Sequence, residues 1–317
     1  MSTTVPAPAA RPADPVLPDG LTCRPLVPAD SFAVFELIAA QEKHDIGTVE
    51  IEEADLIGEW QRPSHDLTAS SLAVLDGERI VAYAEYLGHE RYDAAVHPDF
   101  RGRGIGTTIA RWVQELARSS GAQVIGMPVP EGTAGDRLLA DLGYFVRWTS
   151  WVLRLPPGRT IAERPLPDGY ALRVATEADY EAVWTTVEDA FLEWSRRDRQ
   201  SFEDCAAETW HRPGFEPWHL QVVTGPDGSV VGTVYCHNSP ADDGTLETYV
   251  SRLAVSREHR HRGLAQALLV AAFGAGREHG AAASCLSTDS RTGALSLYEK
   301  VGMETASVWL HRAISLV

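Results

Sequence analysis

Cysteine is scarce in this sequence, and the few cysteines are scattered. The four residues, Cys23, Cys205, Cys236 and Cys285, form no C-x-x-C pair. Zinc sites and disulfide frameworks both show closely spaced cysteines, so the sequence favours neither. We interpret all four as reduced, partly buried thiols, and we predict no metal site.

Long apolar runs are also missing. No stretch of eighteen or more apolar residues occurs, which excludes a membrane-spanning helix. Residues 1–19 are rich in Pro and Ala and lack the apolar core of a signal peptide, so we expect a flexible tail. These two absences predict a cytoplasmic protein with no membrane partner.

Positive charge is in deficit. The sequence has 28 Lys and Arg residues against 44 Asp and Glu residues, a formal net charge of -16. A protein that holds nucleic acid regardless of sequence needs an excess of basic side chains to displace counterions. We therefore expect no nucleic-acid partner. A cationic small molecule would be attracted by the negative electrostatic field of such a protein.

An internal repeat organises the 317 residues, which are enough for two domains of ordinary size. Arg24 and Arg173 are 149 positions apart, and so are Asp30 and Asp179. Each pair marks a short strand followed by a helix start. The segment 157–169 between the two copies is punctuated by Pro and Gly, which is typical of a linker. We predict one domain over residues 20–156 and a second over residues 170–317.

Two glycine-bearing turns follow apolar strands and precede helices. The first is R-G-R-G-I-G at 101–106, and the second is R-H-R-G-L-A at 260–265. A turn of small residues at a helix N-terminus presents bare backbone N–H groups to an anion, so each turn predicts a phosphate-binding cradle. The cradles are 159 positions apart, which places eight extra residues of the second copy in a loop at 237–244.

Each copy predicts the order strand, helices, three or four meandering strands, helix, strand, helix, strand. An aromatic-rich strand closes each copy, near 145–155 and 306–314. This order indicates an α/β fold with a twisted, mostly antiparallel mixed sheet and helices on both faces.

The cradle pattern R-x-x-G-x-G/A, together with L-Y-E-K-V-G-M at 297–303, resembles the GNAT superfamily of acyl-CoA N-acyltransferases. The resemblance covers nearly the whole chain as two tandem units, and it is most similar to the actinobacterial mycothiol synthase group. It implies acetyl-CoA as co-substrate and the primary amine of a small molecule as acceptor.

The resemblance also implies which residues hold coenzyme A. In the second unit, backbone N–H groups would wrap the pyrophosphate, arginines would add charge at its rim, and a splayed fourth strand would pair with the pantetheine arm. The residues concerned are Leu253, Val255, Arg260, Arg262, Gly263, Leu264 and Ala265, and in the first unit Val96, Arg101, Arg103, Gly104, Ile105 and Gly106.

Acyl transfer to an amine requires a base for the amine and an acid for the departing thiolate. Tyr298 stands at the family's general-acid position. Tyr249 occupies the place where many members have a base Glu; Glu247 lies two residues earlier on the same strand face, and His237 is the rival base.

The first unit departs from the pattern in the opposite way. It has Glu90 at the base position, but Leu139 stands where the second unit has Tyr298. We therefore expect a degenerate first unit and a catalytic second unit. The alternatives are mycothiol synthase itself, which would acetylate a cysteinyl pseudodisaccharide, and a non-catalytic acyl-CoA-binding protein. A nucleotide-binding P-loop is disfavoured because neither cradle continues into Lys-Ser/Thr.

Overall fold

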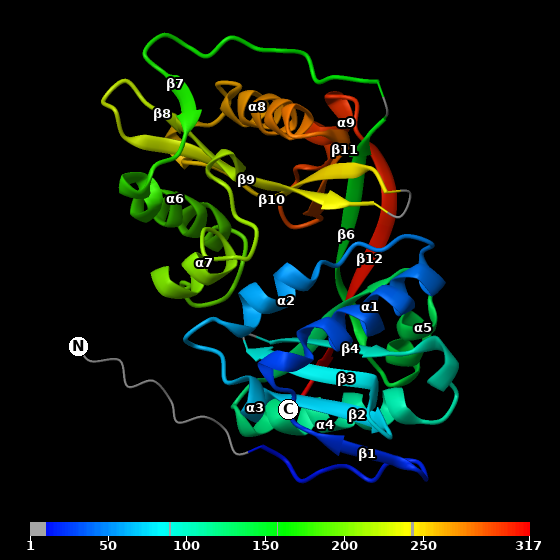
Figure 1. The fold of residues 1–317 in the computed structure, drawn as a ribbon. Helices are drawn as coiled ribbons and strands as arrows, with labels where there is room; N and C mark the ends of the chain where they lie inside the picture. The colour runs from blue at the N-terminus through cyan, green and yellow to red at the C-terminus, as the bar shows by residue number, and fades with distance from the viewer. Residues whose placement is uncertain (1–10, 89, 157, 242–243) are drawn as a thin grey trace, which may run out of the picture. The chain divides into compact units, whose positions relative to one another are not determined.

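The computed structural model describes residues 11–317 except positions 89, 157, 242 and 243. It divides into two compact units (Figure 1). Unit 1 comprises the chain up to Trp148 together with Trp309–Val317, and unit 2 comprises Thr149–Val308. The first ten residues of the expected tail lie outside the described residues. No helix in the described part of the chain is long and apolar enough to cross a membrane.

The sheet strands of unit 1 lie in the order β1-β2-β3-β4-β5-β12. All neighbouring strands in it are antiparallel except β4 and β5, which are parallel. The elements are β1 (Leu21–Arg24), α1 (Ser31–Asp45), α2 (Glu53–Trp60), α3 (Leu67–Ser70), β2 (Ser71–Asp76), β3 (Arg79–Gly88), β4 (Arg91–Val96), α4 (Ile105–Ser119), β5 (Val124–Pro130), α5 (Ala134–Asp141) and the start of β6 (Phe145–Leu155).

Unit 2 repeats this arrangement in the strand order β7-β8-β9-β10-β11-β6. Here β10 and β11 form the parallel pair. The elements are β7 (Ala171–Val174), α6 (Tyr180–Leu192), α7 (Phe202–Glu208), β8 (Leu220–Thr224), β9 (Val230–Pro240), β10 (Leu246–Val255), α8 (Leu264–Glu278), β11 (Ala281–Asp289), α9 (Leu295–Lys300) and β12 (Glu304–Ser315). The predicted mixed α/β class, with two related sheet units, is confirmed.

Helices cover both faces of each sheet because alternate strand residues point to opposite sides. In unit 1, Ile109, Val113 and Leu116 of α4 are buried in one core cluster, and helices α1 and α2 contribute to a second. In unit 2, α8 contributes Leu264, Leu268 and Leu269 to one cluster, while α6 and α7 contribute to the other. Each unit therefore has two cores, one on each side of its sheet.

The two final strands exchange units, which differs from the expectation that each closes its own copy. Ser150–Leu155 of β6 pair with β11 in unit 2, and Trp309–Ser315 of β12 pair with β5 in unit 1. An alternating apolar pattern identifies a strand and its inward face but carries no information on which edge it joins. The pairing partner was therefore beyond the reach of the sequence pattern.

The repeated Arg and Asp residues form the same contact in each unit. Arg24 donates two hydrogen bonds to Asp30 at 2.6 and 2.8 Å, and Arg173 donates two to Asp179 at 2.7 and 2.8 Å. The hydrogen bond from Arg173 is the main reason that the pKa of Asp179 lies well below its ordinary value. This shared pair ties the first strand of each unit to the start of its first long helix.

The extra residues of the second copy lengthen a hairpin. Strand β9 continues through His237 to Pro240, and its register partners on β10 begin at Leu246. His237 therefore lies within a strand, which corrects the prediction that it stands at the edge of a loop. Asp242 and Asp243 of the predicted loop lie outside the described residues.

Candidate functional site

The parallel strands of unit 1 separate almost as soon as they meet. The only register pair between β4 and β5 in the described chain is Arg91 with Gly126, where the Gly126 N–H donates to the Glu90 carbonyl at 2.9 Å. Beyond this point the edge of β4 that faces β5 pairs with no described strand as far as Val96. A gap of this kind can accept an extended ligand through backbone hydrogen bonds.

The cradle turn of unit 1 opens directly into helix α4. Gly104 caps the helix with φ of 82°, a left-handed conformation that glycine adopts without strain. A Cβ atom built on Gly104 would meet no other atom within 4 Å. The N–H groups of the first turn have no acceptor within their own helix, so an anion can approach them.

A cavity of about 320 Å³ joins the strand gap to the cradle in unit 1. Its lining includes five of the six residues predicted to hold coenzyme A in this unit: Val96, Arg101, Gly104, Ile105 and Gly106. Leu139 lies in the same wall. Arg103 does not line the cavity; its guanidinium stands 4.7 Å from the ring centre of Phe100. The cavity therefore combines an apolar groove with a polar turn, which fits a thioester-bearing pantetheine and its pyrophosphate.

The first arginine of each cradle is held by a carboxylate. Arg101 donates to both oxygens of Asp45 at 2.7 and 2.8 Å, and Arg260 donates to both oxygens of Glu193 at 2.8 and 2.7 Å. The Nε of each arginine also donates to the last carbonyl of the preceding strand. These side chains fix the turn to the end of the first long helix, and their charge is already balanced.

The cradle of unit 2 has the same backbone design. Gly263 caps α8 with φ of 84°, and His261 takes φ of 62° where unit 1 has a glycine. The parallel pairing of β10 with β11 ends at Val250, so Leu253 and Val255 lie beyond it. The predicted splay of the fourth strand is therefore present. Arg262 donates to the Glu258 carbonyl at 3.4 Å.

Tyr298 and Leu139 occupy equivalent places in the two units. In each case the residue five positions later donates its N–H to the carbonyl, Met303 to Tyr298 at 3.1 Å and Tyr144 to Leu139 at 2.9 Å. Tyr298 is only 8% exposed, and burial raises its pKa to about 12. The phenol of Tyr298 therefore carries its proton at neutral pH.

The three candidate bases gather on one face of the β9–β10 hairpin. Tyr249 is the register partner of His237, and Glu247 lies two residues before Tyr249 on the same face. His237 Nδ1 stands 3.3 Å from Ser251 Oγ. The Tyr249 hydroxyl stands 2.9 Å from Ser287 Oγ on β11. The structure thus brings all three to the mouth of the splay.

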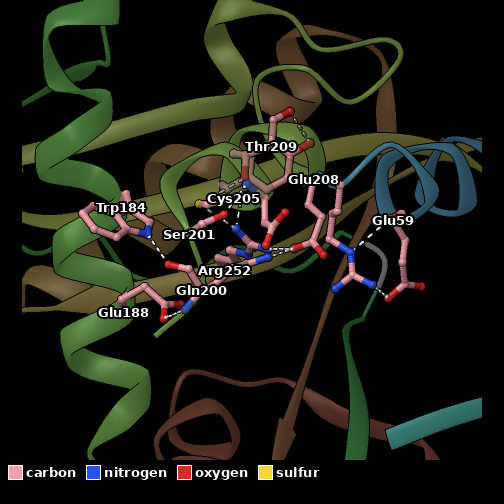
Figure 2. Close-up of polar contacts among 12 residues, drawn as sticks. Glu59, Trp184, Glu188, Gln200, Ser201, Cys205, Glu208, Thr209 and Arg252 are labelled. Carbon is pink, nitrogen blue, oxygen red and sulfur yellow. Dashed lines mark hydrogen bonds and ion pairs between the residues drawn. The ribbon is translucent and has the colours of Figure 1, made fainter. Parts of the chain in front are cut away.

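Two arginines in unit 2 were missed by the sequence reasoning. Arg154 Nε donates to both oxygens of Glu247 at 2.9 and 3.2 Å, and it reaches this site because β6 pairs within unit 2. Arg252 follows a β-bulge that interrupts β10 after Val250. Figure 2 shows its guanidinium among the residues that end α7: it donates to Thr209 Oγ1 at 3.0 Å and to Cys205 Sγ at 3.2 Å, and pairs with Glu208. The break in alternation at 251–252 was the available signal.

The unit 1 cavity also contains a phenol that the sequence reasoning passed over. Tyr92 lines the cavity, and its hydroxyl donates to the Tyr144 hydroxyl at 3.4 Å. Burial holds the pKa of Tyr92 well above its ordinary value. Glu90, which stands at the base position of this unit, accepts a hydrogen bond from Arg147 at 2.6 Å and has φ of 69°.

The protein-family model for the acetyltransferase (GNAT) family matches residues 33–144 and 180–303, more than half of the chain. The mycothiol acetyltransferase of Salinispora tropica is 30% identical over 76% of this chain and 78% of its own. That of Nocardia farcinica is 30% identical over 87% of this chain and 91% of its own.

Solved structures agree with this result. A GCN5-related N-acetyltransferase from Sphaerobacter thermophilus superposes with a TM-score of 0.72 at 26% identity, covering 95% of this chain and 97% of its own. The tandem GNAT protein from the clavulanic acid biosynthesis pathway shares the fold, with a TM-score of 0.69 at 18% identity over 94% of this chain and 99% of its own. Matching motifs, splayed strands and cradles in both halves lead to one conclusion: the chain belongs to the GNAT family and is an acetyl-CoA-dependent acetyltransferase.

Proposed function

We propose that unit 2 transfers the acetyl group to the primary amine of a small molecule, and that Tyr298 is the acid for this reaction. The supporting observation is the phenol itself. Tyr298 belongs to the buried cluster that contains Val255 and Leu264, which flank the cradle, and the equivalent residue in unit 1 is Leu139. A pKa of about 12 keeps the hydroxyl protonated, so that it can give its proton to the departing thiolate of coenzyme A.

Backbone groups would hold the co-substrate in both units. In unit 2 these are the N–H groups from Arg262 to Ala265 and the exposed edge of β10 at Leu253 and Val255; in unit 1 they are the N–H groups from Arg103 to Gly106. Acetyl-CoA supplies the thioester, whose acetyl carbon the amine attacks. Because unit 1 lacks a tyrosine at position 139, we assign it a binding and supporting role.

His237 is the proposed base. Both oxygens of the Glu247 carboxylate accept a hydrogen bond from Arg154, so this carboxylate is already engaged by a cation. The Tyr249 hydroxyl stands 2.9 Å from Ser287 Oγ, and a phenol hydroxyl is a poor proton acceptor. The neutral imidazole of a histidine has one ring nitrogen that can accept a proton. We assign Glu247 the task of attracting the amine, and His237 the task of removing its proton.

The acceptor is proposed to be a small amine of the type used by the relatives that are named mycothiol acetyltransferases. A cysteinyl pseudodisaccharide is therefore the first compound to test. The negative formal charge of the protein favours a cationic acceptor in its protonated resting form.

The proposal is tested by incubating the full chain with acetyl-CoA and a panel of amines that includes this compound, and by measuring the acetylated products by mass spectrometry. We expect one amine class to be acetylated in proportion to enzyme concentration. Tight binding of acetyl-CoA in calorimetry, with no product from any amine, would instead identify a non-catalytic acyl-CoA-binding protein.

A further inference from the structure

The segment between β6 and β7 lies against the cradle of unit 2. The sequence predicts a linker here, and Figure 1 shows the segment in green, passing α9 and α8 on its way to β7. The carbonyl of Ala162 accepts a hydrogen bond from Gln266 Nε2, in the first turn of α8, at 2.8 Å. We call residues 159–166, which lie along α8 and its preceding turn, the strap.

Arg164 of the strap lies at the point where the cradle glycine faces outward. A Cβ atom built on Gly263 would be 2.7 Å from Arg164 Cδ and 2.8 Å from its Nε. The same construction on Gly104 of unit 1 meets nothing within 4 Å. Two glycines with the same conformation and the same position before a helix therefore differ in one respect: one is open and the other is covered.

Ile161 anchors the strap in the core. Its side chain is 6% exposed and belongs to the buried cluster that contains Val255, Leu264 and Tyr298. These are the residues that border the proposed acyl-CoA cleft of unit 2. At the first residue of the strap, an Arg159 nitrogen is 3.9 Å from a Glu304 oxygen. Burial of a whole aliphatic side chain stabilises the folded segment that carries it, so Ile161 can hold the strap in place.

The corresponding segment of unit 1 takes another path. Arg11, which precedes β1, donates to the Ser71 carbonyl at 3.5 Å, and its guanidinium stands 5.4 Å from the ring centre of Trp112 in the middle of α4. Among the residues that the structure describes, none covers Gly104, and the N-terminus of α4 opens to the cavity of about 320 Å³. Within residues 11–317, as far as they are described, the strap is therefore a feature of unit 2.

We propose that the strap closes the acyl-CoA cleft of unit 2, and that acyl-CoA must displace Arg164 and Ile161 to bind there. This inference rests on the proposed function of unit 2. Acetyl-CoA then binds unit 1 first. It binds unit 2 more weakly, because only the fraction of molecules with an open strap can accept it there. Release of the strap switches on acetyl transfer.

The experiment is calorimetric titration of the full chain with acetyl-CoA in the absence of amine. The wild type should show one tight and one weak site. The double variant Ile161→Ser/Arg164→Ala should strengthen the weak site by about tenfold or more while the tight site stays unchanged. The matched control is Glu163→Gln, at an exposed position of the same segment, which should behave as the wild type.

A second measurement is independent of variant folding. Hydrogen exchange of amides 159–166 in the wild type should accelerate when acetyl-CoA is raised from the level that fills the tight site to the level that fills both. Weaker binding at the second site in Arg164→Ala alone would show that Arg164 is a ligand of the phosphates and would overturn the strap.

The strap and the proposed function fail in different ways. If the wild type has two equally tight acetyl-CoA sites and the double variant leaves both unchanged, the strap proposal is wrong and the proposed function stands. If acetyl-CoA binds at neither site, both the strap proposal and the proposed function are wrong. Under the proposal, the double variant should also acetylate amine faster than the wild type at low acetyl-CoA, and at the same rate at saturation.

Discussion

The two units carry the same cradle but differ in access and in chemistry. In unit 1 the cradle glycine Gly104 is uncovered and opens into a cavity, but the residue at the acid position is Leu139. In unit 2 the acid position holds Tyr298, but Arg164 lies over the cradle glycine Gly263. The binding apparatus is a property of the backbone and is shared by both copies, whereas chemistry and access each depend on a few side chains.

The comparison is tested most strongly by Tyr298→Phe, which removes one hydroxyl and keeps the ring in its core. We expect the turnover number to fall about a hundredfold or more, because a positioned acid typically contributes that much. Steady-state kinetics with the best amine checks this. Affinity for acetyl-CoA should be unaltered, and the matched control is Tyr144→Phe, which removes one hydroxyl from a buried tyrosine of unit 1. An unchanged turnover number would mean that Tyr298 is not the acid.

The role of unit 1 is tested by Gly106→Val. A Cβ atom on Gly106 would be 2.7 Å from Leu138 Cδ2, so a branched side chain there should fill the cavity. We expect the tight acetyl-CoA site to weaken by about tenfold or more, as judged from the area lost to the ligand. Acetyl transfer should persist, since it is assigned to unit 2. The control is Ala265→Gly at the equivalent position, and loss of turnover in Gly106→Val would move the reaction to unit 1.

Much of the fold was predictable because it depends on local patterns. The Arg–Asp pairs, the cradle turns before α4 and α8, and the hairpin around Gly77 all follow from residues within a few positions of one another. The acid position in α9 was predictable by resemblance, since its motif is contiguous. Its assignment to catalysis stays a prediction.

The rest depends on partners distant in the sequence. Arg101 pairs with Asp45, 56 residues earlier, and Arg260 with Glu193, 67 residues earlier. The spacing of apolar residues in the sequence does not indicate which distant residues form an ion pair. Both arginines were therefore interpreted as phosphate contacts alone. The strap was missed for a related reason: one isoleucine in a Pro and Gly rich segment gives no periodic signal, and its burial depends on a groove formed by other elements.

The shared Arg–Asp pair allows the stability of the units to be compared. Asp179→Asn should destabilise unit 2 by about 2 kcal/mol at pH 7. The substitution removes the negative charge that accepts two hydrogen bonds from Arg173 and one from the backbone N–H of Thr176. Asp30→Asn should do the same to unit 1. Since the pKa of Asp179 is depressed in the folded state, its contribution is present above pH 4 and fades as the pH falls further. Calorimetric unfolding of both variants checks this; equal midpoints in wild type and variants would contradict it.

A smaller effect should distinguish the units at mildly acidic pH. His219 precedes β8 and is 5% exposed, and unit 1 has Ser70 at the corresponding place before β2. Burial is the main reason that the pKa of His219 falls to about 4, and its Nδ1 accepts the Glu216 N–H at 3.1 Å, a bond that protonation would break. Between about pH 6.5 and pH 4, His219 is protonated in the unfolded chain but not in the folded chain. The free energy of unfolding therefore decreases as the pH is lowered through this range. We expect unit 2 to lose roughly 2 kcal/mol between pH 7 and pH 5, with no such loss in His219→Gln. Urea unfolding at the two pH values measures this difference, and an equal loss in the variant would show that another group carries the proton.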